Sequence, residues 1–143
     1  LNFGKTDVVQ MLNGCIGGLV AITAEPLMPS PLAAILIGAV GGIIVVYGTK
    51  FLLSMKIDDV VGAIPAHLFA GIWGTLAVPI TNSGASFGTQ LLGVVSINAF
   101  VFIVSFIIWF LMRSTFGIRL SKEGETKGTD VTETGVIAYA IRD

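Results

Sequence analysis

Four long apolar segments, separated by short polar or proline-rich breaks, place the strongest constraint on how this chain folds. They occupy residues 8–24, 31–55, 60–80 and 89–116. A helix needs roughly 20 mostly apolar residues to cross a bilayer, with a range of about 17–25. No segment alternates polar and apolar residues over any length, as a half-buried strand would. The sequence therefore predicts an all-α, polytopic membrane protein with four transmembrane helices.

The composition excludes several other classes of protein. Apolar residues make up 54% of the 143 residues and charged residues 12%, whereas a soluble domain is about 25% charged. The net charge of −1 offers no basic face for nucleic acid. No Gly-x-Ser-x-Gly motif and no pair of carboxylates lies within an apolar segment. We therefore expect a protein that resides in a lipid bilayer, is not an enzyme and does not bind nucleic acid.

The distribution of basic residues predicts the orientation in the membrane. If the four segments cross alternately, every lysine and arginine falls on one side, and basic loops mark the cytoplasmic side. The prediction is a membrane region over residues 1–116 and a cytoplasmic carboxy-terminal tail over residues 117–143. The basic residues are Lys5, Lys50, Lys56, Arg113, Arg119, Lys122, Lys127 and Arg142.

Glycines recur at helical spacing inside the first two segments. Gly14 and Gly18 are four residues apart, and so are Gly38 and Gly42. Small residues at this spacing let helix backbones approach closely inside lipid. We expect these helices to pack tightly against other helices.

The only histidine, His67, stands in the middle of the third apolar segment. Helical spacing places Ala63 and Ile64 on its face, together with the small residues Ala70, Gly71 and Gly74 further along the helix. Pro65 lacks an N–H group and is expected to bend the helix near the histidine. The ring either links two helices by a hydrogen bond or lines a path for a substrate or ion, which is the default for an ionisable residue inside a membrane.

Other roles for this region have less support in the sequence. A zinc site needs at least three protein ligands, and neither a second histidine nor a nearby cysteine accompanies His67. We therefore predict no metal and no cofactor. Asp58 and Asp59 stand where the helix begins, so that capping and the helix dipole explain them without a functional role.

Several stretches, in order, resemble the ammonium transporter family (Amt/Mep/Rh), and bacterial Amt sequences most closely. "IDDVVGAIPAHLFAGIWGTLAV" is similar to the histidine-bearing helix of that family. "GKTDVVQMLNGCIGGLVAITAE" and "SPLAAILIGAVGGIIVVYG" resemble its eighth and ninth helices, and the segment from Thr89 resembles the eleventh. The tail "GTDVTETGVIAY" is similar to the family's carboxy-terminal motif.

The resemblance implies part of an eleven-helix fold with an inverted repeat, assembled as a homotrimer in the cell (inner) membrane. It implies that ammonium, or methylammonium, moves as ammonia plus a proton through a histidine-lined pore. His67 would be one of two facing histidines, with Ala63 and Ile64 beside it. Asp59 matches the family's acid at the start of that helix, a structural support.

The resemblance also gives the tail a role. Gly128, Asp130, Gly135 and Tyr139 match the family's regulatory motif, which couples subunits and touches PII-type regulatory proteins. Two alternatives remain open. One is an ammonium sensor, in which the membrane unit drives a signalling domain, and the other is a non-conducting fragment. The expected chain is the carboxy-terminal part of a channel or transporter.

Overall fold

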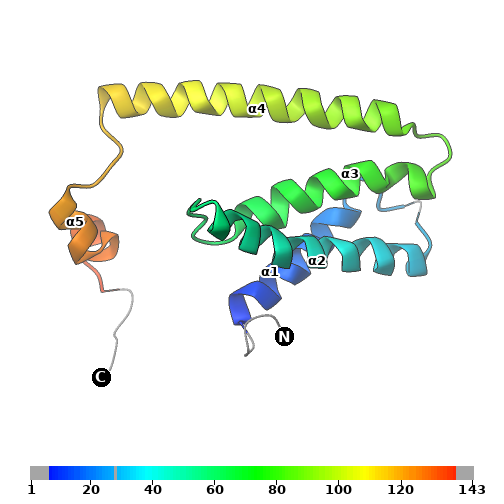
Figure 1. Ribbon diagram of the computed structural model, residues 1–143, viewed down its shortest axis with the longest axis horizontal. Helices are drawn as coiled ribbons and strands as arrows, with labels where there is room; N and C mark the ends of the chain where they lie inside the picture. Colours follow the sequence, from blue (N-terminus) through cyan, green and yellow to red (C-terminus); the bar gives the residue numbers. More distant parts are fainter. Residues whose placement is uncertain (1–6, 28, 138–143) are drawn as a thin grey trace. The chain divides into compact units, whose positions relative to one another are not determined.

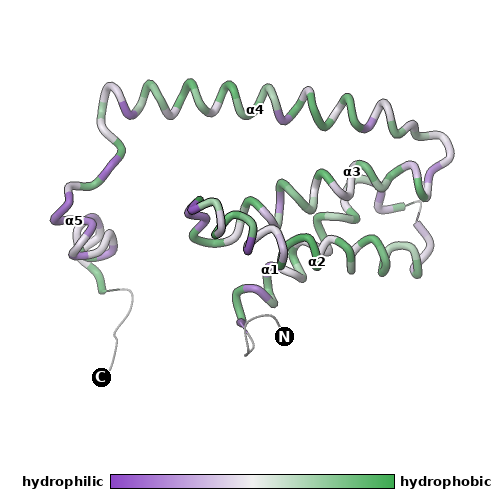
Figure 2. The backbone as a smooth tube through the Cα atoms, in the orientation of Figure 1, coloured by the Kyte–Doolittle hydropathy of each residue, from purple (hydrophilic) through white to green (hydrophobic). Residues whose placement is uncertain are grey.

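The computed structural model describes residues 7–27 and 29–137, and the regular structure in them is helical. The all-α prediction is confirmed for this part of the chain. The chain divides into two units, Leu1–Asn98 and Ala99–Asp143. Figure 1 shows the helices in chain order, and Figure 2 shows the apolar character of α1 to α4 against the more polar α5.

The first two helices begin at side-chain caps. Helix α1 covers Val8–Ile22, and the carboxylate of Asp7 accepts a hydrogen bond from the amide of Gln10 at 3.0 Å. Helix α2 covers Pro31–Ser54, and Ser30 caps it. Proline suits the first helical position, where its missing N–H group costs no hydrogen bond. Both starts agree with the predicted segments, whereas α1 ends two residues before the predicted residue 24.

The third apolar segment forms one continuous helix with an unusual first part. Its beginning, η1, is a π-helical turn over Ile64–Phe69, and α3 follows over Ala70–Thr81. The prediction began this helix at residue 60, but Gly62 has φ +73° and breaks the helical path there. Pro65 therefore stands in the first turn, where it displaces no helical hydrogen bond, and the expected irregularity near it takes the form of π-helical geometry.

The later helices are α4, over Phe87–Thr115, and two short helices in the tail. The tail contains α5 over Lys122–Lys127 and a second π turn, η2, over Asp130–Thr134. Three helical stretches in the described residues are long and apolar enough to cross a membrane: Pro31–Ser54, Ile64–Thr81 and Phe87–Thr115. Helix α1, with 15 residues, is shorter. The four-span count remains a prediction.

Glycines allow α1 and α2 to pack at very short range. A Cβ atom on Gly18 would lie 3.1 Å from the carbonyl oxygen of Gly38, and one on Gly42 would lie 3.3 Å from that of Gly14. Both distances are tighter than ordinary van der Waals contact. The prediction that these helices pack tightly against other helices is confirmed for α1 and α2.

Helix α3 completes a small core with α1 and α2. Ala21, Ile37 and Ala77, one from each of the three helices, are buried together there. The indole N–H of Trp73 donates to the carbonyl of Ile37 at 3.0 Å. This packing buries the face of α3 that contacts α1 and α2, while His67, in the preceding η1 turn, stays exposed.

Candidate functional site

The turn before His67 is fixed by the carboxylate of Asp59. Its two oxygens accept hydrogen bonds from the amides of Ala63 at 2.9 Å and Ile64 at 2.8 Å. These amides lie at the helix start, where no carbonyl of the same helix can reach them. The predicted role in capping thus holds in a modified form: both carboxylate oxygens are engaged, but Asp59 lies four residues before the N-cap residue Ala63 rather than at the N-cap position.

A second helix reaches the same turn. Asn13, in α1, donates its side-chain amide to the carbonyl of Val61 at 2.8 Å. Asn13 was not among the residues predicted to have a functional role. The available signal was an amide side chain within an apolar helix, although the sequence could not identify its partner 48 residues away.

The side chain of His67 is exposed in the described chain, while Pro65 and Ala66 before it are buried. The π turn changes which residues share its face. A π turn closes by i→i+5 hydrogen bonds, one residue later than an α turn, so the residues that follow are rotated relative to an α-helical expectation. Of the three small residues predicted beside His67, Gly71 lines the same groove, whereas Ala70 and Gly74 lie on the buried face.

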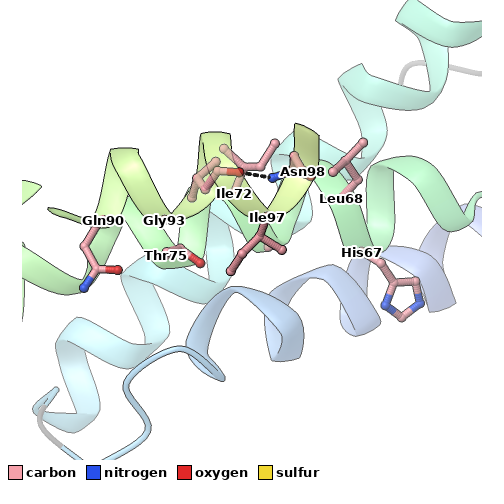
Figure 3. A pocket seen from close by; sticks show the side chains of 10 residues that line it. His67, Leu68, Ile72, Thr75, Gln90, Gly93, Ile97 and Asn98 are labelled. Atoms are coloured by element: carbon pink, nitrogen blue, oxygen red, sulfur yellow. Dashed lines mark hydrogen bonds between the residues drawn. The ribbon is translucent and has the colours of Figure 1, made fainter. Parts of the chain in front are cut away.

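His67 stands at one end of an open groove of about 310 Å³ (Figure 3). Small and aliphatic residues line most of it, and Thr75, Gln90 and Asn98 add polar groups. The amide of Asn98 donates to the carbonyl of Val94 at 2.8 Å, which leaves its side-chain oxygen able to accept another bond. The groove lies along α3 and the first part of α4, within the first unit.

The other predicted pore residues do not line this groove. Ala63 is exposed and Ile64 is half-buried, and both stand in the first helical turn, where their amides bind Asp59. The sequence missed Thr75, Gln90 and Asn98, although polar side chains within apolar segments mark such positions. The described residues contain no group of three or more His, Cys, Asp or Glu side chains that could hold a metal ion.

The predicted tail motif falls on turns. Gly128, with φ +99°, ends α5, Asp130 begins η2, and Gly135, with φ +69°, ends it. Left-handed backbone of this kind favours glycine, which has no Cβ to clash. Tyr139, the fourth predicted residue, lies outside the described residues.

An ion pair precedes the motif in the tail. Arg119 donates to both carboxylate oxygens of Glu125, at 2.6 and 3.2 Å, with Arg119 largely exposed. Ser121 caps the intervening α5 through the amide of Gly124. Through the hydrogen bond and the opposite charge, Glu125 raises the pKa of Arg119. The hydrogen bond from Arg119, followed by its charge, lowers the pKa of Glu125.

Comparison with known proteins gives one consistent result. The sequence profile of the Ammonium Transporter Family matches residues 1–139. The chain is 35% identical to ammonium transporter Amt2 of Archaeoglobus fulgidus, over 97% of this chain and 34% of that protein. It is 40% identical to a putative ammonium transporter of Synechocystis, over 94% of this chain and 31% of that protein.

A more distant relative extends the same pattern. The ammonium transporter of Bacillus subtilis is 32% identical over 94% of this chain and 37% of its own length. The chain thus spans about a third of the length of these relatives. All are named as transporters rather than enzymes, in agreement with the prediction. The chain belongs to the Ammonium Transporter Family.

Proposed function

We propose that this chain is the carboxy-terminal part of an ammonium transporter, and that His67 lines the path along which ammonium crosses the membrane as ammonia plus a proton. The observation that carries the proposal is the position of His67. It is the chain's only histidine, it lies within an apolar helix, and its exposed ring borders a groove rather than the packed core.

The chemistry of imidazole suits such a path. A neutral ring offers one nitrogen that donates a hydrogen bond and one that accepts. Imidazole can both accept and release a proton under physiological conditions. A hydrocarbon-like channel wall provides few other groups that can receive a proton from ammonium. His67 can therefore bind ammonia and relay the proton, whereas a purely structural ring would be satisfied between helices.

The proposal includes a topology. Residues 1–116 form the membrane region, with four spans in the cell (inner) membrane. Residues 117–143 form a tail on the cytoplasmic side. The one-sided distribution of lysine and arginine supports this orientation. We also propose a homotrimer, with tail residues Gly128, Asp130, Gly135 and Tyr139 available to a PII-type regulatory protein. The trimer and the contact with a PII-type protein are proposed from the chain's membership of the family.

The test uses the complete transporter, purified and reconstituted in liposomes. We expect His67→Gln to preserve trimer assembly but to reduce electrogenic uptake of ammonium or methylammonium by more than about tenfold across a pH series. Glutamine keeps hydrogen-bonding capacity but cannot titrate. His67→Glu restores a titratable group and should transport with altered ion selectivity.

Ser114→Ala provides the control, because the Ser114 hydroxyl bonds only within its own helix, to the carbonyl of Phe110 at 2.8 Å. We expect it to transport at the wild-type rate. Current at the wild-type level from His67→Gln would assign the ring a purely structural role. Absence of current from the wild-type transporter would favour the ammonium sensor.

A further inference from the structure

The turn that precedes His67 is held from outside by a side chain of another helix. Asn13 lies half-buried in α1, and its amide nitrogen is 2.8 Å from the carbonyl oxygen of Val61. A buried or lipid-facing amide that donates across a helix boundary restrains both elements, because loss of the bond leaves two unsatisfied polar groups. The Val61 carbonyl belongs to the irregular turn and has no helical donor of its own at that point.

Gly62 is matched to this contact. It has φ +73°, and a Cβ atom built on it would collide with the side-chain nitrogen of Asn13. Two independent features therefore favour glycine at this position: the left-handed backbone and the occupied space. The side chain of Asn13 therefore packs directly against the Val61–Gly62 peptide.

The same peptide leads directly into the helical turn of the histidine. The carbonyl of Gly62 accepts a hydrogen bond from the amide of Ala66 at 3.2 Å, one residue before His67. Asp59 holds the two intervening amides, of Ala63 and Ile64. The start of the π turn is thus fixed on one side by Asp59 and on the other by Asn13, and the start of a helix determines the direction of each side chain in its first turns.

We propose that Asn13 is a positioning residue for His67: by binding the Val61 carbonyl, it sets the start and register of the π turn and so directs the ring toward the groove. The inference rests on the proposed function of His67 and adds a residue from α1 to it. Asn13 acts through the backbone of residues 61–66 and touches neither the ring nor the transported molecule in this arrangement.

Two substitutions separate hydrogen bonding from space filling in the complete transporter. Asn13→Leu keeps a similar volume and removes the donor. Asn13→Asp keeps the shape but can donate to the Val61 carbonyl only when its carboxyl group is protonated. Thr49→Val is the matched control, because the half-buried Thr49 hydroxyl also donates to a backbone carbonyl, that of Val45 at 2.9 Å, but within α2.

The first measurement is amide hydrogen exchange in peptides that cover residues 60–67. Asn13→Leu should exchange roughly threefold faster there, the factor that corresponds to the average worth of a hydrogen bond between membrane helices. The Thr49→Val control should leave this region unchanged. Unchanged exchange in Asn13→Leu would overturn the inference, even if transport fell.

The second measurement is methylammonium uptake per correctly assembled transporter. At neutral pH, Asn13→Leu and Asn13→Asp should both fall about tenfold, since small displacements of a reacting group have large kinetic effects. Below the pKa of the introduced carboxyl, Asn13→Asp should recover relative to wild type at the same pH, whereas Asn13→Leu should not. Equal pH profiles for the two variants would reduce Asn13 to a packing residue and overturn the inference.

The two proposals fail separately. Transport by His67→Gln tests the role of the ring alone, while exchange at residues 60–67 tests the Asn13 contact alone. Gly62→Ala supplies a second, independent route, because its methyl group displaces the Asn13 amide. Its effect on exchange should be smaller in an Asn13→Ala background than in wild type. Additive effects of the two substitutions would contradict the inference.

Discussion

The η1–α3 helix and α4 are both candidate membrane spans, but their polar side chains are used differently. The η1–α3 stretch has a mean hydropathy of 1.3 over its best window, against 2.6 for α4. At η1–α3, hydrogen bonds join different elements: Asn13 to Val61 at its start, Trp73 to Ile37 in its middle, and Asn82 to Glu25 at its end. In α4, the bonds recorded from Asn98, Ser114 and Thr115 return to the helix's own carbonyls.

The difference concerns what each helix contacts: α3 packs against neighbouring helices, whereas no side chain of α4 is buried in the described residues. α3 has buried residues packed on α1 and α2, whereas α4 has none in the described chain. Apolar side chains gain nothing by leaving lipid for one another, so helices in a membrane are held by close packing and polar contacts. In the described residues, contacts with α1 and α2 hold the helix that carries the histidine, and α4 buries no residue in the same way.

The largest expected effect comes from the same substitution in the two helices. A methyl group on Gly74, in α3, would collide with the backbone of Ala21, so Gly74→Ala should lower the free energy of unfolding by about 1–3 kcal/mol. Gly93, in α4, has no atom within 4 Å of a built Cβ. Gly93→Ala should therefore raise the free energy of unfolding by about 0.5–1 kcal/mol, because alanine has the higher helix propensity. Unfolding in mixed micelles measures both changes. Similar changes in the free energy of unfolding for the two variants would show that α3 and α4 do not differ in how tightly they are packed.

A smaller effect is expected at the helix start. Asp59→Ala removes the acceptor of the Ala63 and Ile64 amides and should cost about 1 kcal/mol, as loss of a cap does. Asp59→Asn keeps one acceptor oxygen and should lie between wild type and Asp59→Ala. Ser114→Ala, in α4, should change stability by much less, because its hydroxyl serves only its own helix. The measurement is the same unfolding transition, and an Asp59→Ala midpoint equal to that of Ser114→Ala would contradict the cap.

The sequence predicted the features that depend on local pattern. Apolar runs located α2, η1–α3 and α4 to within a few residues, and glycine spacing predicted that the first two apolar helices pack tightly, without identifying which glycines meet. Both follow from periodicity, which a single chain displays directly. The role of Asp59 at the helix start was predicted because its position is also local, although the helical turn begins at Ile64 rather than at residue 60.

Features that depend on contacts between distant residues were not predictable in this way. The π turn at His67 depends on the contacts that Asp59 and Asn13 make with the turn around Gly62. No periodic pattern in the sequence predicts these contacts. The π turn moved Ala70 and Gly74 away from the face predicted for the histidine. The polar lining from Gln90 and Asn98 likewise required knowledge of which helix lies beside α3.

Two tryptophans allow a finer test of the comparison. Trp73 donates to the Ile37 carbonyl between α3 and α2, whereas Trp109 lies exposed on α4. Trp73→Phe keeps an aromatic ring but loses the interhelical bond and should cost about 0.6 kcal/mol, rising to at most about 1.7 kcal/mol. Trp109→Phe should be close to neutral in detergent. An equal loss in both variants would show that ring size, not the bond, sets the cost.

The smallest effect is expected in the second unit, where Arg119 and Glu125 form an exposed pair. Because the folded pKa of Glu125 is lowered, the pair contributes stability above the unfolded pKa of about 4.3 and loses it as pH falls through the lowered value. An NMR titration of Glu125 should therefore give a midpoint below that of the Arg119→Gln variant. The difference should shrink in high salt, since exposed charges are screened. Identical midpoints would show that the pair does not order the tail, and a difference insensitive to salt would point to a hydrogen bond shielded from water, as at the helix interfaces of the first unit.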